Sequence, residues 1–474
     1  MTGAVDAVVV GSGPNGLVAA VTLAMSGRSV VVLEAEPTIG GGTRSAELTI
    51  PGFLHDICSA VHPLGVGSPV LSSLPLSDHG LRWLHPEIAL SHPLDDGRAG
   101  LVHRDVQRTA DGLGADGDAW LRHIAPHSRR WPQLLAMIMR PLPQIPRHPL
   151  TLAKFGLPAL APASRLGDRW FAGDEARALF AGSAAHAFLP LSKPMTASFG
   201  LVLLAAAHAV GWPVAEGGSQ AIADALVSLL HAHGGSIETQ RRVTSFADIP
   251  PSRTVLFDLS PIQVAGIAGD RLPDRYRRRL TRFRHGPGAF KIDYALDGPV
   301  PWRNEASRRA GTVHVCGTAT DVARAEAEVA AGRHPEHPFV LVAQQSVVDP
   351  SRAPSGKHTL WVYCHVPNGS TVDMTDAVEA QIERFAPGFR DLVLARHIAN
   401  SAWFEAHDAT YIGGDIGGGA NDGAQLLFRP VFGRPYRTPD PTLFLCSAST
   451  PPGGGVHGMC GFNAATTALR GPLR

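Results

Sequence analysis

The sequence predicts an α/β fold that combines a nucleotide-binding domain with a second domain of mixed β-sheet plus helices. Three observations support this fold class. A pattern of strand, glycine turn, helix, strand and acid opens the chain at residues 6–34, an alternating strand pattern appears at 286–296, and a glycine-rich loop separates a strand from the last helix at 442–469. The first pattern is typical of a Rossmann-like unit, in which parallel strands bind a nucleotide at their carboxyl ends.

Composition and charge are those of an ordinary globular protein. Of the 474 residues, 44% are hydrophobic and 18% are charged, and this length corresponds to roughly two to four domains. The formal net charge of +1 gives no reason to expect a nucleic acid partner. No basic segment precedes the first apolar run, and the later apolar run 199–212 would span only about 20 Å as a helix. A cytoplasmic location is therefore expected.

The cysteines show no pairing pattern. None of them forms a CxxC motif, so a disulfide framework, a zinc site and a dithiol redox centre are all disfavoured. Nor does any cluster of His, Asp and Glu have metal-ligand spacing, and no metal site is predicted. Buried thiols in a reducing compartment are the expectation. The five cysteines are Cys58, Cys316, Cys364, Cys446 and Cys460.

The first glycine turn has the spacing of a dinucleotide-binding fingerprint. Gly11, Gly13 and Gly16 directly follow the strand expected at 6–10. In such a turn the first glycine permits the tight bend, the second lets the backbone approach a pyrophosphate, and the third allows helix and strand to pack closely. Pro14 and Asn15 lie in this turn, directly before a helix expected at 17–25, whose free N–H groups would bind the phosphates.

An acidic residue ends the second strand, 23 residues after the first glycine. This residue, Glu34, would accept hydrogen bonds from ribose hydroxyls and would repel a 2′-phosphate, which disfavours NADP. The glycines at 40–42 follow, and their turn resembles the GG motif of the glutathione-reductase-like FAD superfamily, which packs against the FAD diphosphate. FAD is therefore expected rather than NAD. Its predicted contacts in this part of the chain are Glu34, Ala35, Gly41, Gly42, Thr43 and Arg44.

A second glycine-rich loop lies near the C-terminus. A strand is expected at 442–446, the loop at 447–459 and a helix at 461–469. Free N–H groups at a helix N-terminus favour negative charge, so this loop would stabilise the charge that reduction places on a flavin. The further predicted cofactor contacts are Val243, from a strand entry at 234–243, and Ser449, Gly455, Val456 and Met459 of this loop.

The region between these motifs contains helical stretches, such as 116–139, and then a proline-rich apolar segment at 140–165. Six prolines in the segment are too many for one helix. Three interpretations are open: a lid over a hydrophobic pocket, a patch that touches a membrane surface, or short core helices joined by proline turns.

The motifs together resemble a known superfamily. Residues 6–34 with the GG turn, the segment 424–430 and the segment 443–465 are similar to the phytoene desaturase and amine oxidase superfamily of flavoproteins. Within it, residues 51–64 and 447–461 resemble the pyridine nucleotide-disulfide oxidoreductase domain-containing protein 2 group, which is phytoene-dehydrogenase-like. The likeness runs almost end to end and is weakest at 71–179.

The resemblance implies a discontinuous FAD-binding domain at 1–70, 205–270 and 405–474. The substrate domain would then comprise 71–204 and 271–404, including the proline-rich region as a lid. No second glycine fingerprint lies between a strand and a helix, so a single nucleotide is expected, and reduced flavin would pass its electrons to oxygen or a quinone. Disulfide chemistry is not expected, because paired cysteines are missing.

The strand expected at 286–296 carries one lysine in an apolar stretch. It resembles the amine oxidase strand whose lysine holds a water at the flavin N5 atom, which would place Lys291 beside the isoalloxazine ring as the catalytic residue. A lysine that reaches solvent from a strand edge is the alternative. Carotenoid desaturases generally lack this lysine, which disfavours a strict desaturase.

Three functions are consistent with these features. The first is an FAD-dependent oxidoreductase that removes a hydride from a C–C or C–N bond of an apolar small molecule. The second is a redox-neutral isomerase or hydratase of a polyene, and the third is a non-catalytic binding protein on the same scaffold. His55, His62 and His457, and a glycine-rich loop at 411–419, are further candidates for contact with flavin or substrate. The sequence leaves substrate identity and oligomeric state open.

Overall fold

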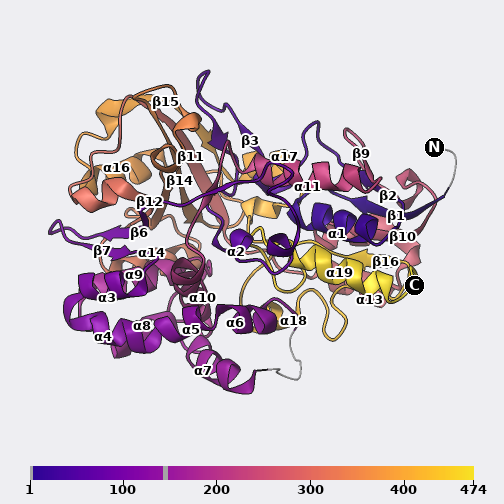
Figure 1. Ribbon diagram of the computed structural model, residues 1–474, viewed down its shortest axis with the longest axis horizontal. Coiled ribbons are helices and arrows are strands. Elements are labelled where there is room, and N and C mark those ends of the chain that lie inside the picture. Colours follow the sequence, from indigo (N-terminus) through magenta and orange to yellow (C-terminus); the bar gives the residue numbers. More distant parts are fainter. Residues whose placement is uncertain (1–3, 142–147) are drawn as a thin grey trace.

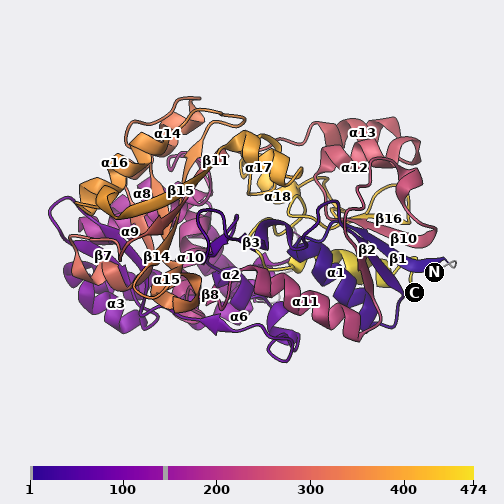
Figure 2. The ribbon, with the colours of Figure 1, turned by 90° about the horizontal axis from the view of Figure 1, so that it is seen from above.

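Two main β-sheets lie toward opposite ends of an elongated molecule, and both chain termini lie beside the same sheet (Figure 1, Figure 2). The computed structural model describes residues 4–141 and 148–474. The proline-rich segment predicted at 140–165 therefore falls partly outside the described residues. The α/β class, with a Rossmann-like domain and a second domain of mixed sheet and helices, is confirmed.

The sheet beside the termini has five strands, and each neighbouring pair in it is parallel. β-Branched strands buried on both faces are typical of parallel sheets, which explains the unbroken valine runs in the sequence. In spatial order the strands are β16 (Leu443–Leu445), β10 (Ser252–Phe257), β1 (Val5–Val10), β2 (Val30–Leu33) and β9 (Ser236–Glu238).

Helices cover both faces of this sheet. Ala7 and Val9 of β1 belong to the core cluster that includes α1 (Pro14–Met25), α11 (Gln220–Ala232) and α19 (Met459–Leu469). The alternate residues Val8 and Val10 pack with α12 (Pro261–Ala268) and α13 (Asp274–Thr281). Helix α19 lies against α1, and this packing brings the C-terminal glycine loop next to the first glycine turn.

The second sheet has seven strands and is mixed. Strands β6 and β12 are parallel, while the other neighbouring pairs are antiparallel. In spatial order the strands are β15 (Val393–Ala399), β11 (Gly288–Leu296), β14 (His358–Val366), β13 (Val340–Ala343), β12 (Ala310–Val315), β6 (Ile88–Pro93) and β7 (Ala99–Val102).

The two faces of the seven-stranded sheet have different roles. Phe290 and Ile292 of β11 lie on the face that packs against α16 (Thr375–Phe385) in a separate core cluster. Trp361 and Tyr363 of β14 lie on the opposite face, with α9 (Asp174–Ala185), α10 (Thr196–Ala209) and α14 (Ala319–Ala330) in the larger cluster. The period of two along each strand thus separates a closed core from the face that borders the site.

The helical stretch predicted at 116–139 is helical but not continuous. It consists of α4 (Gly117–His123), α5 (Ala125–Arg129) and α6 (Trp131–Ile138), and a proline lies in the first turn of α5 and of α6. Proline is tolerated there but cannot continue a preceding helix, because it lacks an N–H donor. The same layer contains α3 (Val106–Gly112), α7 (Pro149–Ala159) and α8 (Ala163–Trp170).

Short elements complete the fold. Two small antiparallel pairs supplement the main sheets: β3 (Ser45–Ala46) with β4 (His55–Asp56), and β5 (Trp83–Leu84) with β8 (Val214–Ala215). The remaining α-helices of the described residues are α2 (Pro63–Val66), α15 (Gln345–Val348), α17 (Ser401–His407) and α18 (Gly423–Phe428). Within 4–141 and 148–474, no helix combines the length and apolar character needed to cross a bilayer.

Candidate functional site

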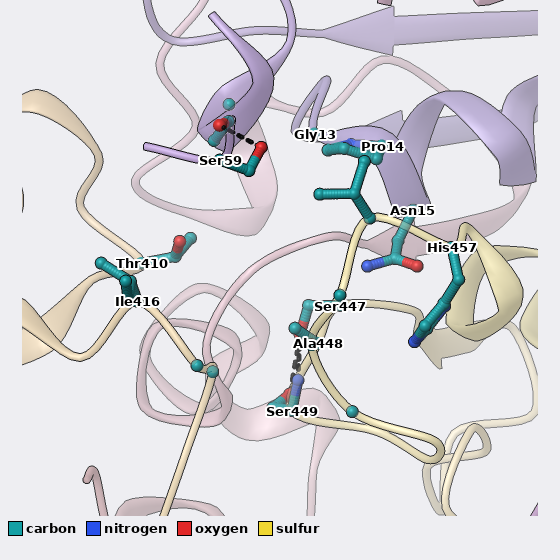
Figure 3. Close-up of a pocket in the computed structure, with 18 of the residues that line it drawn as sticks. Gly13, Pro14, Asn15, Ser59, Thr410, Ile416, Ser447, Ala448, Ser449 and His457 are labelled. Carbon is teal, nitrogen blue, oxygen red and sulfur yellow. Dashed lines mark hydrogen bonds between the residues drawn. The ribbon is translucent and has the colours of Figure 1, made fainter. Parts of the chain in front are cut away.

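One large cavity lies between the two sheets. Its volume is about 990 Å³, and its wall includes both glycine turns, the C-terminal loop, strands of the seven-stranded sheet and the helices α6, α7 and α10. Figure 3 shows Gly13, Pro14 and Asn15 around the same space as the loop that carries Ser447 and Ser449. The predicted cofactor residues on the wall are Gly11, Gly13, Pro14, Asn15, Glu34, Ala35, Gly41, Gly42, Arg44, Val243, Ser449, Gly455 and Val456.

Three predicted cofactor residues lie behind the wall rather than on it. Gly16 packs against the preceding turn, the Thr43 hydroxyl donates to the Gly40 carbonyl at 2.8 Å, and Met459 begins α19. Each supports a loop whose other members reach the cavity. Their contact with a cofactor stays a prediction.

The first glycine turn leaves no room for a side chain. Gly11 has a φ of +100°, and a Cβ there would lie 2.9 Å from the Asp258 carbonyl oxygen. A Cβ on Gly16 would lie 2.2 Å from the Gly11 carbonyl oxygen. Glycine is therefore required at both positions, as the fingerprint predicts.

Asp258 was not predicted from the sequence. It follows β10, lines the cavity, and its carboxylate accepts a hydrogen bond from the Gly16 N–H at 2.8 Å. Burial raises the pKa of Asp258 to about 8. A residue directly after a parallel strand lies at the ligand-binding edge of such a sheet, and this position was the signal that could have identified it.

Glu34 is held firmly at the end of β2. Its carboxylate accepts hydrogen bonds from the Ser12 N–H at 2.9 Å, the Ser12 hydroxyl at 2.5 Å and the Glu36 N–H at 2.8 Å. These bonds fix the carboxylate on the cavity wall beside the first glycine turn. The geometry is suited to a ribose, because an oriented carboxylate can accept hydrogen bonds from its hydroxyl groups.

The GG turn packs directly on the first glycine turn. A Cβ on Gly41 would lie 3.1 Å from the Gly13 Cα atom, so the two backbones approach closely on the cavity wall. Arg44 follows, buried, and its Nη1 atom lies 3.1 Å from Nε2 of His407. Burial, followed by the Arg44 charge, lowers the pKa of His407 to about 4. The guanidinium therefore contacts a neutral imidazole.

Arg44 fits an anionic ligand. Among the described residues no carboxylate forms an ion pair with its guanidinium, and its buried Nε atom has no hydrogen-bond partner. A buried, unpaired cation is unfavourable unless a negative group compensates it. The diphosphate of a dinucleotide would supply that group.

The C-terminal loop is anchored by its own polar groups. Ser447 and Ser449 (Figure 3) are hydrogen-bonded through their hydroxyls at 2.7 Å. His457 accepts a hydrogen bond from the Met459 N–H at 3.1 Å. Burial lowers the pKa of His457 to about 4, which is consistent with a neutral cap on α19. His457 lines the cavity, and its contacts in the protein are structural.

A second buried cation borders this loop, and the sequence reasoning did not identify it. Arg429 donates to the Ala448 carbonyl at 3.3 Å and to the Asn421 side chain, while its Nε atom has no partner in the described residues. Burial lowers the pKa of Arg429, with Asp415 acting in the opposite direction. Asn421 and Ala448 line the cavity, so Arg429 places positive charge immediately behind its wall.

Lys291 is buried on β11 and is 1% exposed, so the alternative of a lysine that reaches solvent is wrong. Its ammonium forms an ion pair with Asp293 and lies 5.8 Å from the ring centroid of Trp361. Trp361 lines the cavity, whereas Lys291 does not. Its predicted position beside a flavin ring stays a prediction.

Two histidines complete this buried cluster around Asp293. The Nδ1 atoms of His55 and His397 each lie 3.7 Å from an Asp293 carboxylate oxygen. Burial would raise the pKa of Asp293, but Lys291 and the histidines hold it below its ordinary value. Burial lowers the pKa of His55 to about 4, so this histidine is neutral. Within the cluster, Lys291 and Asp293 form a compensated charge pair.

His62 has a structural role. Its Nε2 atom is hydrogen-bonded to the Ser219 hydroxyl at 2.8 Å, and burial lowers its pKa to about 4. By contrast, the glycine-rich loop predicted over the site does reach it: Tyr411, Ile416 and Gly417 line the cavity.

The end of the cavity away from the glycine turns is mostly apolar. Phe155 and Ala159 of α7 lie on this wall, so the proline-rich region does cover part of a hydrophobic pocket. Apolar side chains from α6, α7, α10, the loops that follow α6, α9 and α10, and the seven-stranded sheet complete it. They include Met137, Met139, Leu152, Phe188, Val202, Leu203, Trp212, Leu341, Ala343 and Trp361.

Comparisons with known proteins agree with this architecture. Residues 9–74 match the NAD(P)-binding Rossmann-like domain. The chain is 28% identical to the pyridine nucleotide-disulfide oxidoreductase domain-containing protein 2 of Rattus norvegicus, over 98% of this chain and 93% of the relative. One of the subunits of limonene dehydrogenase from Castellaniella defragrans is 29% identical, but only over 23% of this chain and 19% of the relative.

Solved structures share the fold over nearly the whole chain. An oxidoreductase from Methanosarcina mazei has a TM-score of 0.65 at 18% identity and covers 98% of this chain and 100% of its own. Putrescine oxidase has a TM-score of 0.63 at 16% identity, with coverage of 98% and 99%. Cyclohexylamine oxidase from Brevibacterium oxydans has a TM-score of 0.59 at 14% identity, with coverage of 99% for both chains.

These similarities confirm the resemblance that the motifs predicted. The relatives along the full chain carry the name of the predicted group, and the structural neighbours include amine oxidases. The chain is similar to the pyridine nucleotide-disulfide oxidoreductase domain-containing protein 2 of rat and mouse over nearly its whole length, and it shares its fold with putrescine oxidase and cyclohexylamine oxidase.

Proposed function

We propose that this protein is an FAD-dependent oxidoreductase that removes a hydride from a C–C or C–N bond of an apolar small molecule. The observation that carries the proposal is the continuity of one cavity from the glycine turns to an apolar chamber. The hydrogen-bond donors and charged side chains of the first part suit a dinucleotide. The second part excludes water and therefore selects apolar ligands. The names of the relatives, limonene dehydrogenase and two amine oxidases, support C–C and C–N substrates respectively.

The residues that would hold FAD follow from the cavity wall. Glu34 would accept hydrogen bonds from the ribose, and the two packed glycine turns with Arg44 would hold the diphosphate. The loop at 447–459, with Arg429 behind it, would border the flavin ring and favour negative charge there. When bound, FAD supplies a two-electron acceptor for the hydride.

The chamber positions the substrate and keeps water out. The C–H bond of the substrate breaks, the hydrogen would leave with the electron pair as a hydride to the bound cofactor, and one proton would leave the neighbouring carbon or nitrogen as the double bond forms. Trp361 and Tyr363 of β14 line the cavity, where they would orient the reacting bond. The lysine behind Trp361 would hold a proton or a water near the reacting centre.

The two electrons must then leave the protein. The sequence shows no paired cysteines and no second nucleotide fingerprint, so oxygen or a quinone is the proposed acceptor. The five cysteines are all buried and unpaired.

An absorption spectrum of the purified protein, before and after heat release of the cofactor, is the first test. Flavin bands with FAD recovered in solution are expected, and anaerobic addition of amines, terpenes and other apolar compounds should bleach the oxidised flavin. A flavoprotein that turns over only after pre-reduction, without net use of reductant, would instead be an isomerase or hydratase. A colourless protein that does not take up FAD would be a binding protein.

A further inference from the structure

The surface of helix α7 is unusual for a globular protein. Leu150 and Leu157 are 76% and 75% exposed, and Leu160, directly after the helix, is 57% exposed. Positions 150, 157 and 160 recur at helical spacing, so these leucines form one outward stripe. They are the most exposed large aliphatic side chains among the described residues.

The other side of the same helix faces the cavity. Phe155 and Ala159 are buried, and both lie on the wall of the apolar chamber. Helix α7 is therefore apolar on both sides, and it forms a single layer between solvent and the substrate end of the cavity. Figure 1 shows α7 at the outer edge of the helical layer, remote from both sheets.

The charge around this helix has one sign. Between Asp118 and Asp168 the sequence contains seven arginines and lysines and no aspartate or glutamate, although the whole chain has a net charge of only +1. Lys154 lies on the exposed side of α7, among the leucines, and Arg140 and Arg165 are exposed on either side of it in sequence. In the described parts of the chain, no carboxylate forms an ion pair with these three cations.

We propose that the outer face of α7 docks on an anionic lipid surface. Exposed leucines beside a lysine on a short helix, with further basic residues flanking the helix in sequence, are suited to lie at the boundary between headgroups and acyl chains. The unbroken positive charge is complementary to an anionic surface and would repel a second copy of the same face. Two of the three interpretations of the proline-rich region are thereby combined: the region forms part of a pocket wall, and it also contacts a membrane surface.

The location of the helix adds a consequence for substrate entry. Because α7 also lines the chamber, an apolar molecule dissolved in the lipid could reach the cavity without passing through water. This consequence rests on the proposed function, whereas the docking itself does not. Binding to lipid is therefore measured with no substrate present.

Co-sedimentation with large vesicles tests the docking. We expect the full-length protein to bind vesicles of phosphatidylcholine with phosphatidylglycerol and to bind pure phosphatidylcholine at least tenfold more weakly. The double variant Leu150→Glu/Leu157→Glu should lose at least tenfold in affinity for the anionic vesicles. Leu394→Glu, on the edge strand β15 and with a leucine 48% exposed, is the matched control and should bind as the wild type does.

Thermal unfolding of each variant shows whether the substitutions preserve the fold, and both variants should melt as the wild type does because the replaced side chains are exposed. Unchanged vesicle binding by the double variant, or no binding by the wild type, would overturn the proposal. Light scattering tests whether a second copy of the chain covers this face instead of a lipid surface. If the wild type were a dimer and the double variant a monomer, the face would be a dimer interface and the proposal would be overturned. A protein that does not bind flavin would contradict the proposed function, but it would not change the vesicle-binding results.

Discussion

The carboxylate of Asp258 accepts a hydrogen bond from the backbone N–H of Gly16 at 2.8 Å, and this bond ties β10 to the start of α1. The two residues are far apart in sequence and meet only because β10 and β1 are parallel neighbours. The bond uses one of the free N–H groups of the helix, so Asp258 supports the turn that we propose to bind the diphosphate. A buried carboxylate in this place also makes the site sensitive to pH.

The pKa of Asp258 predicts how stability varies with pH. An unfolded aspartate titrates near 3.8, whereas burial raises the folded value to about 8. Between pH 3.8 and about pH 8, Asp258 is protonated in the folded protein and ionised in the unfolded protein. The contribution of Asp258 to stability is therefore fully present below pH 3.8 and is lost as the pH rises through about 8. Asp258→Asn keeps the acceptor and removes the titration. The free energy of unfolding of the flavin-free variant should therefore fall less steeply in this window, by up to about 1.4 kcal/mol per pH unit.

Chemical denaturation at a series of pH values measures this slope. Asp224→Asn, at an exposed position of α11, is a suitable control and should leave the slope unchanged. Identical slopes for wild type and Asp258→Asn would mean that Asp258 is already ionised in the folded protein.

Glu34 should be needed for FAD binding and also for the local structure. Glu34→Gln removes the charge and one pair of acceptor sites, so affinity for FAD should fall on the order of 10- to 100-fold, which corresponds to about 1.4–2.8 kcal/mol. The stability of the flavin-free protein should fall by about 1 kcal/mol, because the amide replaces a charged acceptor for the Ser12 N–H and hydroxyl.

Titration of flavin-free protein with FAD, followed by fluorescence, gives the affinity. Glu47→Gln changes a carboxylate of the same type away from the cavity wall and should bind FAD normally. If Glu34→Gln bound FAD as tightly as the wild type, Glu34 would serve only to hold the first glycine turn.

The parts of the site that could be predicted are those built from local sequence. The first glycine turn, the GG turn and the acid at position 34 lie within one strand–helix–strand unit, whose spacing specifies their geometry. Strand and helix positions differed from expectation by only a few residues: β1 begins at Val5 rather than at residue 6, and α1 begins at Pro14 rather than at residue 17. The domain boundaries stay a prediction.

Residues that act through distant contacts could not be predicted in this way. Asp258 lies in no motif, and although Arg429 lies in the segment 424–430, its position behind the cavity wall appears only when separate segments pack together. The same holds for the chamber wall, where His186 and Trp212 join residues of β13 and β14. Lys291 was identified by its strand, but its ion pair with Asp293 depends on burial, which the alternating pattern alone does not specify.

Lys291 and Asp293 should be coupled in stability. Lys291→Met leaves a buried carboxylate without its cation, so the free energy of unfolding should fall by about 3–5 kcal/mol. Lys291→Met/Asp293→Asn removes both charges and should recover much of that loss. Thermal or urea unfolding of the four members of this cycle measures the coupling.

The same cycle separates a structural role from a catalytic one. If Lys291 acts near the flavin, reoxidation of photoreduced flavin by oxygen should be at least tenfold slower in both variants, including the one whose stability is recovered. If the double variant recovers stability and its flavin is reoxidised at the wild-type rate, Lys291 has only a structural role.

Cys58 should be unreactive although it lines the cavity. Burial raises the pKa of its thiol to about 11, so near pH 8 the thiolate fraction is on the order of 100-fold smaller than that of an ordinary cysteine. Alkylation by iodoacetamide, mapped by mass spectrometry, should therefore label Cys58 far more slowly in the native protein than in the denatured protein. Because attack on a disulfide also requires a thiolate, the native protein should not reduce small disulfides. Rapid native labelling of Cys58, suppressed in Cys58→Ser, would show that the cavity activates this thiol and would reopen thiol chemistry at the site.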